Sequence, residues 1–336
     1  MNEIFPLDQL QRPIKDLRIS VTDRCQFRCS YCLPAEHIDV MRQQSTIEKY
    51  LSFREIVAVI KSFSQCGVKK IRLTGGEPLL RKNMAGLIRD IKSINDIEEV
   101  SMTTNGALLP AVLDDLIEAG LDRITVSIDA IEQALFESIT GTNYAVNEII
   151  KTIIRCSHSS LKQVKVNCVI QKGINEHQVI PILELFRGTG IVVRFIEFMD
   201  VGNINGWQSN QVYHSKEVLQ SIAQKWSFTA LPENHPGEVA NRFIFDDAMG
   251  EFGVISSISQ PFCQQCNRAR LSSKGEIYTC LFSNKGHNIR PFISQPKVLL
   301  KQISTIWQHR KDQYSMQRNQ HPLKKQSKIE MFVIGG

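Results

Sequence analysis

The most restrictive feature of this sequence is an alternation of short β-branched segments with helical segments over its first two thirds. Six β-then-α units follow one another, which predicts a parallel sheet with right-handed crossover connections. The predicted strands are Leu17–Thr22, Lys70–Thr74, Val100–Asn105, Arg123–Asp129, Val164–Ile170 and Val192–Phe198. The predicted helices include Phe53–Cys66, Asn83–Ile94, Pro110–Ala119, Val146–Ser157, Glu176–Phe186 and Ser215–Lys225.

Apolar and polar residues alternate within these strands. Side chains two positions apart share a face, whereas a strand buried on both faces reads as an almost continuous apolar run. One face is therefore apolar, and the other is polar and carries basic side chains, which are Arg18, Lys70, Arg72 and Lys165. A closed barrel filled by side chains would not tolerate such a face, but an open or partial barrel around a charged ligand would. The alternative is an open sheet whose polar face meets solvent.

After about residue 230 the pattern changes. Short predicted strands, Arg242–Asp246 and Glu251–Ser256, precede a group of cysteines and a helical tail. The chain is therefore expected to consist of an α/β core over residues 1–230 and a smaller C-terminal domain over residues 231–336. The polar stretch Gln317–Lys328 is expected to be loosely held.

Composition narrows the class of protein. With 42% hydrophobic and 22% charged residues, the 336-residue chain can build a full core. Its net charge of +6 suits an anionic ligand as well as nucleic acid. No apolar run approaches the roughly 18 residues that a membrane helix needs, and the N-terminus does not resemble a signal peptide. We expect a cytoplasmic protein that does not insert into membranes.

The nine cysteines indicate metal binding. An odd number argues against a fully paired, secreted disulfide framework. Cys66, Cys156 and Cys168 stand alone in apolar segments, as small buried hydrophobic residues do. The other six form two tight groups, which are Cys25, Cys29 and Cys32, then Cys263, Cys266 and Cys280.

The first group has the spacing Cys-x3-Cys-x2-Cys and follows the first predicted strand. Soft thiolate ligands select iron–sulfur clusters or zinc. Three thiolates on a cubane cluster leave one iron free to bind another molecule, whereas structural zinc normally has four ligands. His37 is the candidate fourth ligand for zinc. Tyr31, beside the last cysteine, could cover an adenine ring.

The cysteine spacing with Tyr31, together with the stretch TGGEP at residues 74–78, resembles the signature of the radical S-adenosylmethionine (SAM) enzymes. The resemblance implies a partial (β/α)6 TIM-type barrel with a [4Fe-4S] cluster held by the first cysteine group. It also implies that four residues bind SAM, which are Tyr31, Gly76, Ser127 and Met199.

The second group, Cys263-x2-Cys266-x13-Cys280, again has three cysteines. A zinc knuckle completed by His287 is one interpretation. Two arginines, Arg268 and Arg270, stand directly beyond the loop. An open iron flanked by two cations could seat an anionic substrate that also carries a ligating base.

Taken together, these motifs resemble the GTP 3′,8-cyclase family of radical SAM enzymes. The resemblance runs from Leu17 to Gly336 and includes TDRCQFRCSYC, KIRLTGGEP, TTNG, KVN, RFIEFM, the second cysteine group and the terminal double glycine. One departure is Gln26, where the family usually carries asparagine. Both side chains are amides, so we expect the cluster to be retained.

This resemblance implies two [4Fe-4S] clusters and SAM as cofactors, and GTP as substrate. In that family the reduced first cluster cleaves SAM, the 5′-deoxyadenosyl radical removes the 3′ hydrogen of GTP, and the ribose radical attacks C8 of guanine. The product, 3′,8-cyclo-7,8-dihydro-GTP, is the first intermediate of molybdenum cofactor biosynthesis. Implied partners are an electron donor and the downstream cyclic pyranopterin monophosphate synthase, and a homodimer is allowed.

The resemblance also assigns residues to the substrate. The expected GTP contacts are Arg18, Lys70, Arg72, Thr103, Lys165, Arg194, Arg268, Ala269 (through its backbone) and Arg270. Arginine suits bidentate contact with phosphate oxygens. In the resembling family the tail reaches into the active site near the arginine that matches Arg18, so the resemblance implies Arg18, Gly335 and Gly336 as catalytic residues. The apolar run Ile329–Ile334 should dock and carry the two glycines to a fixed place, where their lack of a side chain lets them enter a narrow cavity.

Two other functions compete with this one. Another radical SAM enzyme with an auxiliary cluster, such as a peptide-modifying maturase, would lack the Arg268/Arg270 pair and the double-glycine tail. A zinc-binding nucleic-acid module would gather its basic residues with exposed aromatic side chains. Here the cations alternate with apolar residues inside strands, which disfavours nucleic acid as a partner.

Overall fold

The protein is described here from a computed structural model, which covers residues 5–34, 50–318 and 328–335. Its core is a sheet of six parallel strands in sequence order, which supports a partial barrel. The strands are β1 (Asp16–Ser20), β2 (Lys70–Thr74), β3 (Glu99–Thr104), β4 (Arg123–Ser127), β5 (Gln163–Ile170) and β6 (Val192–Glu197).

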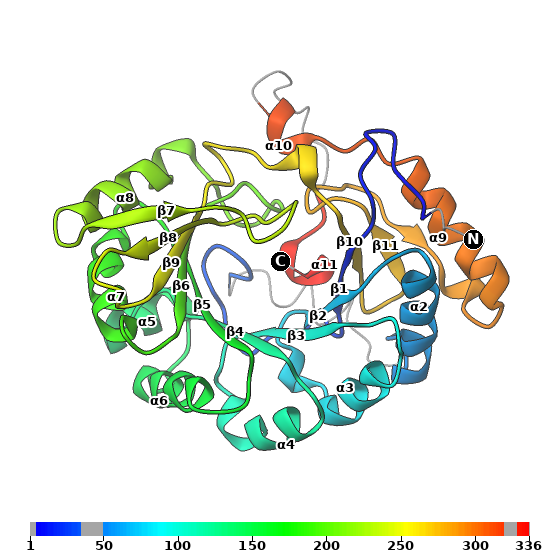
Figure 1. Cartoon of the computed structure of the whole chain (residues 1–336), viewed down its shortest axis with the longest axis horizontal. Coiled ribbons are helices and arrows are strands. Elements are labelled where there is room, and N and C mark those ends of the chain that lie inside the picture. Colours follow the sequence, from blue (N-terminus) through cyan, green and yellow to red (C-terminus); the bar gives the residue numbers. More distant parts are fainter. Residues whose placement is uncertain (1–4, 35–49, 319–327, 336) are drawn as a thin grey trace.

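Helices cover the outside of this sheet, so that sheet and helices form a ring around a central space (Figure 1). They are α2 (Phe53–Gln65), α3 (Met84–Lys92), α4 (Leu113–Glu118), α5 (Gln133–Thr140), α6 (Val146–Ser157), α7 (Val179–Phe186) and α8 (Ser215–Ala223). The apolar side chains of the strands face these helices, and Leu17, Ile19 and Ile71 are completely buried. This burial supplies the main driving force for the fold.

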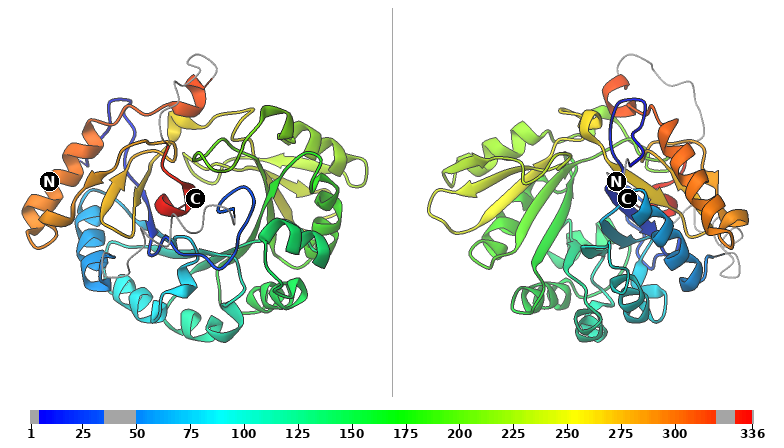
Figure 2. Two further views of the ribbon diagram at one scale, coloured as in Figure 1. Left: turned by 180° about the vertical axis from the view of Figure 1, so that it is seen from behind. Right: turned by 45° about the vertical axis from the view of Figure 1, so that its right-hand side comes forward.

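The C-terminal part adds strands to both edges of the six-stranded sheet. On one side β9 (Glu251–Ile255) pairs with β6 in parallel and continues into β8 (Asn241–Phe245) and β7 (Phe228–Leu231). On the other side β10 (Arg268–Leu271) pairs with β1 in parallel and continues into β11 (Glu276–Tyr278) and β12 (His287–Asn288). The result is one open sheet of twelve strands (Figure 2).

Three helices complete the C-terminal part. Helix α9 (Pro296–Gln308) packs beside α2, and the short α10 (Tyr314–Gln317) and α11 (Met331–Ile334) follow. Figure 1 shows α11 and the end of the chain inside the ring. Within the described ranges, no helix combines the length and apolar character needed to cross a membrane.

The sequence predictions for the strands are confirmed to within two residues, and β2 has the predicted bounds. Two predicted helices are divided. A 3₁₀ turn, Glu176–Gln178, precedes α7, and another, Leu109–Ala111, precedes α4. The second division falls at Val112, whose backbone angles (φ −131°, ψ 0°) are not helical. The prediction also missed α5. Of the stretch 317–328, residues 319–327 lie outside the described residues, and the division at residue 230 stays a prediction.

Candidate active site

The first cysteine group lies on the loop that follows β1, at the carboxyl end of the parallel strands. The helix α5 anchors this loop. The Phe27 ring packs edge-on against Phe136, with ring centroids 5.8 Å apart. The Arg28 N–H donates to the Thr140 carbonyl at 2.6 Å, and the Ser30 N–H donates to the Ile139 carbonyl at 3.2 Å. The helix that the sequence did not predict therefore fixes the cysteine loop.

The thiols of Cys25, Cys29 and Cys32 are half-buried, and none is in a disulfide. Burial raises the pKa of all three thiols, that of Cys25 to about 11, and the charges of neighbouring groups add to the effect. Thiolates form here once a positively charged group binds them. In the described ranges, no three His, Cys, Asp or Glu side chains are arranged for a single metal ion. A cubane cluster makes a different demand, because each thiolate binds a different iron, and three soft sulfur donors on one short loop fit it. His37 lies outside the described residues.

The glycines of the TGGEP stretch pack against the cysteine loop. A Cβ at Gly76 would lie 2.3 Å from the Arg24 carbonyl oxygen, and one at Gly75 would lie 2.4 Å from the Thr22 carbonyl oxygen. The Gly76 N–H donates to the Thr22 carbonyl at 2.8 Å. Only glycine permits this close approach. Contact between Gly76 and SAM stays a prediction.

Glu77 is a buried anchor that the sequence analysis did not single out. Its carboxylate accepts hydrogen bonds from the Thr104 hydroxyl at 2.7 Å and the Asn105 N–H at 2.8 Å. Burial raises the pKa of Glu77 to about 7. The Asn105 amide donates to the Cys25 Sγ at 3.7 Å, and the Gln26 amide donates to the Asn105 Oδ1 at 3.3 Å. The amide at position 26 thus joins the network around Cys25.

The remaining predicted SAM contacts come from three different parts of the chain. The Tyr31 hydroxyl donates to the Asp129 Oδ2 at 2.6 Å, and burial raises the pKa of Asp129 to about 6. Ser127 ends β4, and Met199 follows β6 and lines the central cavity. Binding of SAM by these residues stays a prediction.

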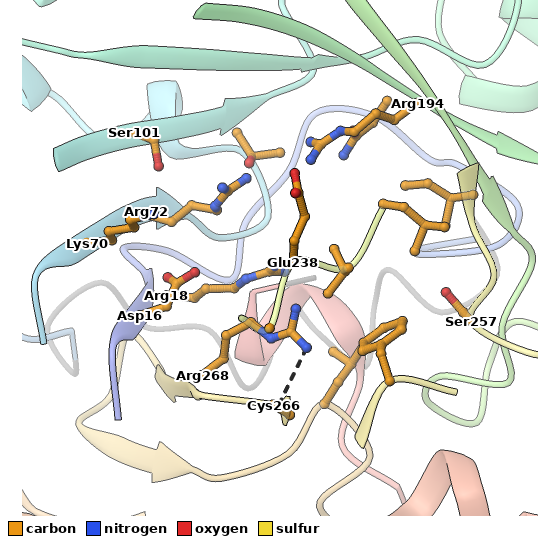
Figure 3. A pocket seen from close by; sticks show the side chains of 18 of the residues that line it. Asp16, Arg18, Lys70, Arg72, Ser101, Arg194, Glu238, Ser257, Cys266 and Arg268 are labelled. Atoms are coloured by element: carbon orange, nitrogen blue, oxygen red, sulfur yellow. Dashed lines mark hydrogen bonds between the residues drawn. The ribbon is translucent and has the colours of Figure 1, made fainter. Parts of the chain in front are cut away.

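A cavity of about 810 Å³ fills the inside of the ring, and the polar face of the parallel strands lines it. Eight of the predicted substrate residues line it. They lie on the core strands and on β10, and are Arg18, Lys70, Arg72, Thr103, Lys165, Arg194, Arg268 and Arg270. Figure 3 shows the side chains of Arg18, Arg72 and Arg194 directed into this space. The sequence analysis predicted that the polar face of the strands surrounds an enclosed space, and this prediction is confirmed. The alternative, an open sheet whose polar face meets solvent, is wrong.

Strand register concentrates positive charge in one row of this cavity. Arg18 pairs in register with Arg72 on β2 and with Arg270 on β10. The neighbouring row alternates in charge, because Asp16 lies between Arg268 and Lys70. Adjacent strands are about 4.8 Å apart, so like charges in one row repel each other. The row of three arginines is left without a neutralising neighbour in register.

The pKa values follow this arrangement. Burial, followed by Arg270, Arg72 and Arg268, lowers the pKa of Arg18 well below its usual value. Burial and Arg194 lower the pKa of Lys165 to about 7, and burial and Arg268 lower that of Arg270 to about 10. The Nε atoms of Arg18 and Arg72 are buried without a hydrogen-bond partner among the described residues. Such a set of cations favours an anionic ligand.

The second cysteine group lines the same cavity. Cys263 lies in a 3₁₀ turn, Cys266 follows it, and Cys280 follows β11. Arg268 Nη2 lies 3.5 Å from the Cys266 Sγ (Figure 3). Burial alone would raise the pKa of Cys266, but Arg268 and Arg310 outweigh it and lower the pKa to about 6. His287, the candidate fourth zinc ligand, is exposed on β12 and is not among the described residues that line the cavity.

Successive side chains of β10 point alternately into the cavity and into the core. Arg268 and Arg270 face the cavity, whereas the side chain of Ala269 is completely buried in the core. A substrate contact of Ala269 through its backbone stays a prediction. Arg310 was missed by sequence reasoning, because it lies 44 residues beyond Cys266 and no local spacing links the two.

The C-terminal tail enters the ring beside β1. Phe332 and Ile334 are buried, so the predicted docking of the apolar run is confirmed. Arg270 donates hydrogen bonds to the carbonyl oxygens of Ile334, at 3.4 Å, and Gly335. Gly335 has φ +71°, and a Cβ there would lie 2.6 Å from the Thr74 Cγ2. The hydrogen-bond partner of the carbonyl groups of Ile334 and Gly335 is thus Arg270, the register neighbour of Arg18. Gly336 lies outside the described residues.

Comparison with known proteins places this arrangement in a family. The model of the radical SAM superfamily matches residues 19–186, and that of Molybdenum Cofactor Synthesis C matches residues 191–316. A GTP 3′,8-cyclase of Xanthomonas campestris pv. campestris (strain 8004) is 43% identical over 330 residues, 98% of this chain and 97% of the relative. One of Staphylococcus epidermidis (strain ATCC 12228 / FDA PCI 1200) is 44% identical over 342 residues and covers both chains completely. The chain belongs to the GTP 3′,8-cyclase family.

The match to the radical SAM superfamily bears on cofactors, and solved structures bear on the fold. Radical SAM membership implies a [4Fe-4S] cluster and SAM. Streptococcus suis SuiB bound to S-adenosylmethionine superposes with a TM-score of 0.62 at 14% identity, over 88% of this chain and 65% of that chain. SuiB bound to the precursor peptide SuiA gives a TM-score of 0.63 with the same identity and coverage. At this identity, the likeness shows only that this chain shares its fold with SuiB.

Proposed function

We propose that this chain is a GTP 3′,8-cyclase, which converts GTP to (8S)-3′,8-cyclo-7,8-dihydroguanosine 5′-triphosphate at the start of molybdenum cofactor biosynthesis. The observation that carries the proposal is that the basic strand residues and the second cysteine group line the same cavity. Anaerobic incubation with SAM, a reductant and GTP, followed by mass spectrometry of the product, tests it. Recovery of unchanged GTP from cluster-loaded protein that still cleaves SAM would contradict it.

The first cysteine group is proposed to hold a [4Fe-4S] cluster that, with SAM bound, supplies the electron transfer and hydrogen abstraction. The protein's own residues act around it. Glu77 and Asn105 orient Cys25, Asp129 holds the Tyr31 hydroxyl, and the sheet with its helices encloses the space. Enclosure protects a reactive radical from water and from side reactions.

GTP is proposed to bind in the cationic cavity. A triphosphate would supply the negative charge that the row Arg270–Arg18–Arg72 lacks, and arginine forks suit phosphate oxygens. Cys263, Cys266 and Cys280 are proposed to hold a second [4Fe-4S] cluster, which would offer an iron without a protein ligand to the base of GTP. Three cysteines that line the substrate cavity, with Arg268 beside one of their sulfurs, support this.

The proposed function also implies protein partners and a cellular location. We expect an electron donor, the enzyme that forms cyclic pyranopterin monophosphate, and a cytoplasmic location, where thiols stay reduced. All nine cysteines are free, which supports a reducing compartment.

The iron content should distinguish clusters from zinc. Anaerobically reconstituted protein is expected to contain roughly eight irons per chain, at about four per cluster, and to be brown. Replacing Cys29 by alanine should abolish SAM cleavage, because the cluster loses one of its three ligands. Elemental analysis and an assay for 5′-deoxyadenosine measure both. Stoichiometric zinc with no iron, or SAM cleavage at the parent rate, would contradict the assignment.

The two arginines beyond the second loop should bind GTP rather than SAM. Each of Arg268→Ala and Arg270→Ala removes a charge-assisted contact worth roughly 1.5–3 kcal/mol, which corresponds to about a tenfold to hundredfold weaker affinity. Calorimetric titrations with GTP and with SAM measure the two effects. Arg155→Ala, an exposed arginine paired with Asp114 on the outside of the ring, is the matched control. Equal weakening for both ligands would point to misfolding instead.

Binding of GTP should take up a proton at Lys165. With a pKa of about 7, this side chain is mostly neutral at pH 8 in the free protein. A nearby triphosphate favours the charged form and raises the pKa, so binding draws up to about one proton from the buffer and weakens as pH rises from 7 to 9. Calorimetry at pH 8 in buffers of different ionisation enthalpy measures the uptake, and Lys165→Met should remove most of it. Identical heats in all buffers for the parent protein would refute this role.

A further inference from the structure

Three buried charged residues meet behind the second cysteine loop. Asp8, Arg12 and Arg310 are each at most 3% exposed. One oxygen of Asp8, Oδ2, accepts from Arg12 Nε at 2.6 Å and lies 3.3 Å from Arg310 Nη1. The N-terminal segment and the end of α9, about 300 residues apart in sequence, are thereby joined. The sequence analysis singled out none of the three.

Each arginine of this group reaches a cysteine of the second group. Arg12 Nη1 donates to the Cys263 carbonyl at 2.6 Å. Arg310 Nη1 donates to the Cys266 carbonyl at 2.6 Å, and its Nη2 lies 3.1 Å from the Cys266 Sγ. Arg310 therefore contacts a candidate ligand sulfur directly, whereas the contact of Arg12 with the second cysteine group is to the backbone carbonyl of Cys263.

Further contacts hold the two arginines in place. The Trp307 indole N–H donates to the Arg12 carbonyl at 3.0 Å, and the Arg310 guanidinium lies 4.6 Å from the centre of the Trp307 ring. The Gln9 N–H donates to the Arg310 carbonyl at 3.1 Å. Two carboxylates face the two buried guanidinium groups, because Arg310 Nε also lies 3.6 Å from the Asp312 Oδ2. The group is therefore balanced in charge, and its ion pairs hold Arg310 with its Nη2 against the Cys266 sulfur.

We propose that Arg310 is a positioning residue for the second cluster, which fixes the Cys266 ligand and raises the reduction potential of the cluster through its hydrogen bond to the sulfur. This inference rests on the proposed function, because it requires the second cluster. Hydrogen bonds and positive charge at the ligand sulfurs stabilise the more negative, reduced state of an iron–sulfur cluster. Asp8 supports the effect by holding Arg310 in place.

The test measures the potential of the second cluster alone. The background is the full chain with Cys25, Cys29 and Cys32 replaced by alanine, which leaves one cluster to titrate by electron paramagnetic resonance. In this background, Arg310→Gln should lower the equilibrium constant for reduction about tenfold, a shift of about 59 mV for one electron. Arg310→Lys keeps the charge and should recover part of the shift. Iron content, at about four per chain, shows that each variant carries its cluster.

Arg12→Gln is the matched control, because it disturbs the same Asp8 network but touches no sulfur. Its potential should stay close to that of the background. An unchanged potential in Arg310→Gln would overturn the proposal, and so would equal shifts in the two variants. Loss of the cluster in Arg310→Gln alone, with Arg310→Lys and Arg12→Gln retaining it, would support the positioning role. A background protein that binds no iron would overturn the second cluster itself, a failure distinct from a bound cluster that is insensitive to Arg310.

Discussion

Replacement of Cys266 by alanine is expected to abolish the conversion of GTP while SAM cleavage continues. The structure separates the two cysteine groups by their surroundings. Cys266 lines the cavity together with the basic strand residues, and Arg268 and Arg310 lie 3.5 and 3.1 Å from its sulfur. The first group lies on the loop after β1, held by α5. Loss of the Cys266 thiolate should remove one of the three ligands of the second cluster and leave the first cluster undisturbed.

The measurement compares two products from the same anaerobic reaction, 5′-deoxyadenosine and the cyclised nucleotide. The matched control is Cys66→Ala, which removes a buried thiol on the outer side of the fold, where its sulfur lies 3.5 Å from the Ser304 hydroxyl. This control should retain both activities. Cyclised product from Cys266→Ala at near the parent rate would remove any substrate role for the second cluster, whereas loss of SAM cleavage as well would indicate a wider collapse.

The parts of the fold that the sequence predicted are those encoded locally. In β2 the alternation of Ile71 and Leu73 with Lys70 and Arg72 fixes both the strand and its two faces, because side-chain direction reverses at each residue. The pairing of β10 with β1 is different. Its partners, such as Arg18 and Arg270, are about 250 residues apart, and nothing in either segment specifies the other. The row of three arginines was therefore visible only as separate basic residues.

The same distinction holds for the site. Cysteine spacing identified all six candidate ligands, because ligands of one metal group cluster in sequence. Their supports were not found. Glu77 and Asp129 are buried carboxylates whose partners come from other strands and loops, and Asp8 and Arg310 meet only in the folded chain. An isolated acidic or basic residue in a sequence looks like an ordinary surface charge, and only tertiary contact reveals that it is buried.

Removal of Gly335 and Gly336 is expected to abolish the cyclised product while the clusters, SAM cleavage and GTP binding largely persist. The tail is anchored before it reaches the glycines, since Phe332 and Ile334 are buried and the Ser20 hydroxyl lies 3.4 Å from the Phe332 carbonyl oxygen. Truncation should therefore spare the fold. What it removes is the carbonyl of Gly335, which Arg270 holds within the row that contains Arg18. We propose that the tail keeps this row oriented for the attack on GTP.

Three measurements on the truncated protein separate this role from a loss of folding, namely iron content, 5′-deoxyadenosine formation and GTP affinity. A second variant, Gly335→Ala, keeps the full chain length but disfavours the backbone conformation found at position 335. Its φ of +71° disfavours alanine, and the new methyl group would meet the Thr74 side chain at 2.6 Å. It should therefore make less product than the parent, with SAM cleavage retained. Product formation at an unchanged rate by the truncated protein would show that the tail is dispensable. Alanine at position 335 would then be tolerated as well, because no catalytic geometry would depend on that carbonyl.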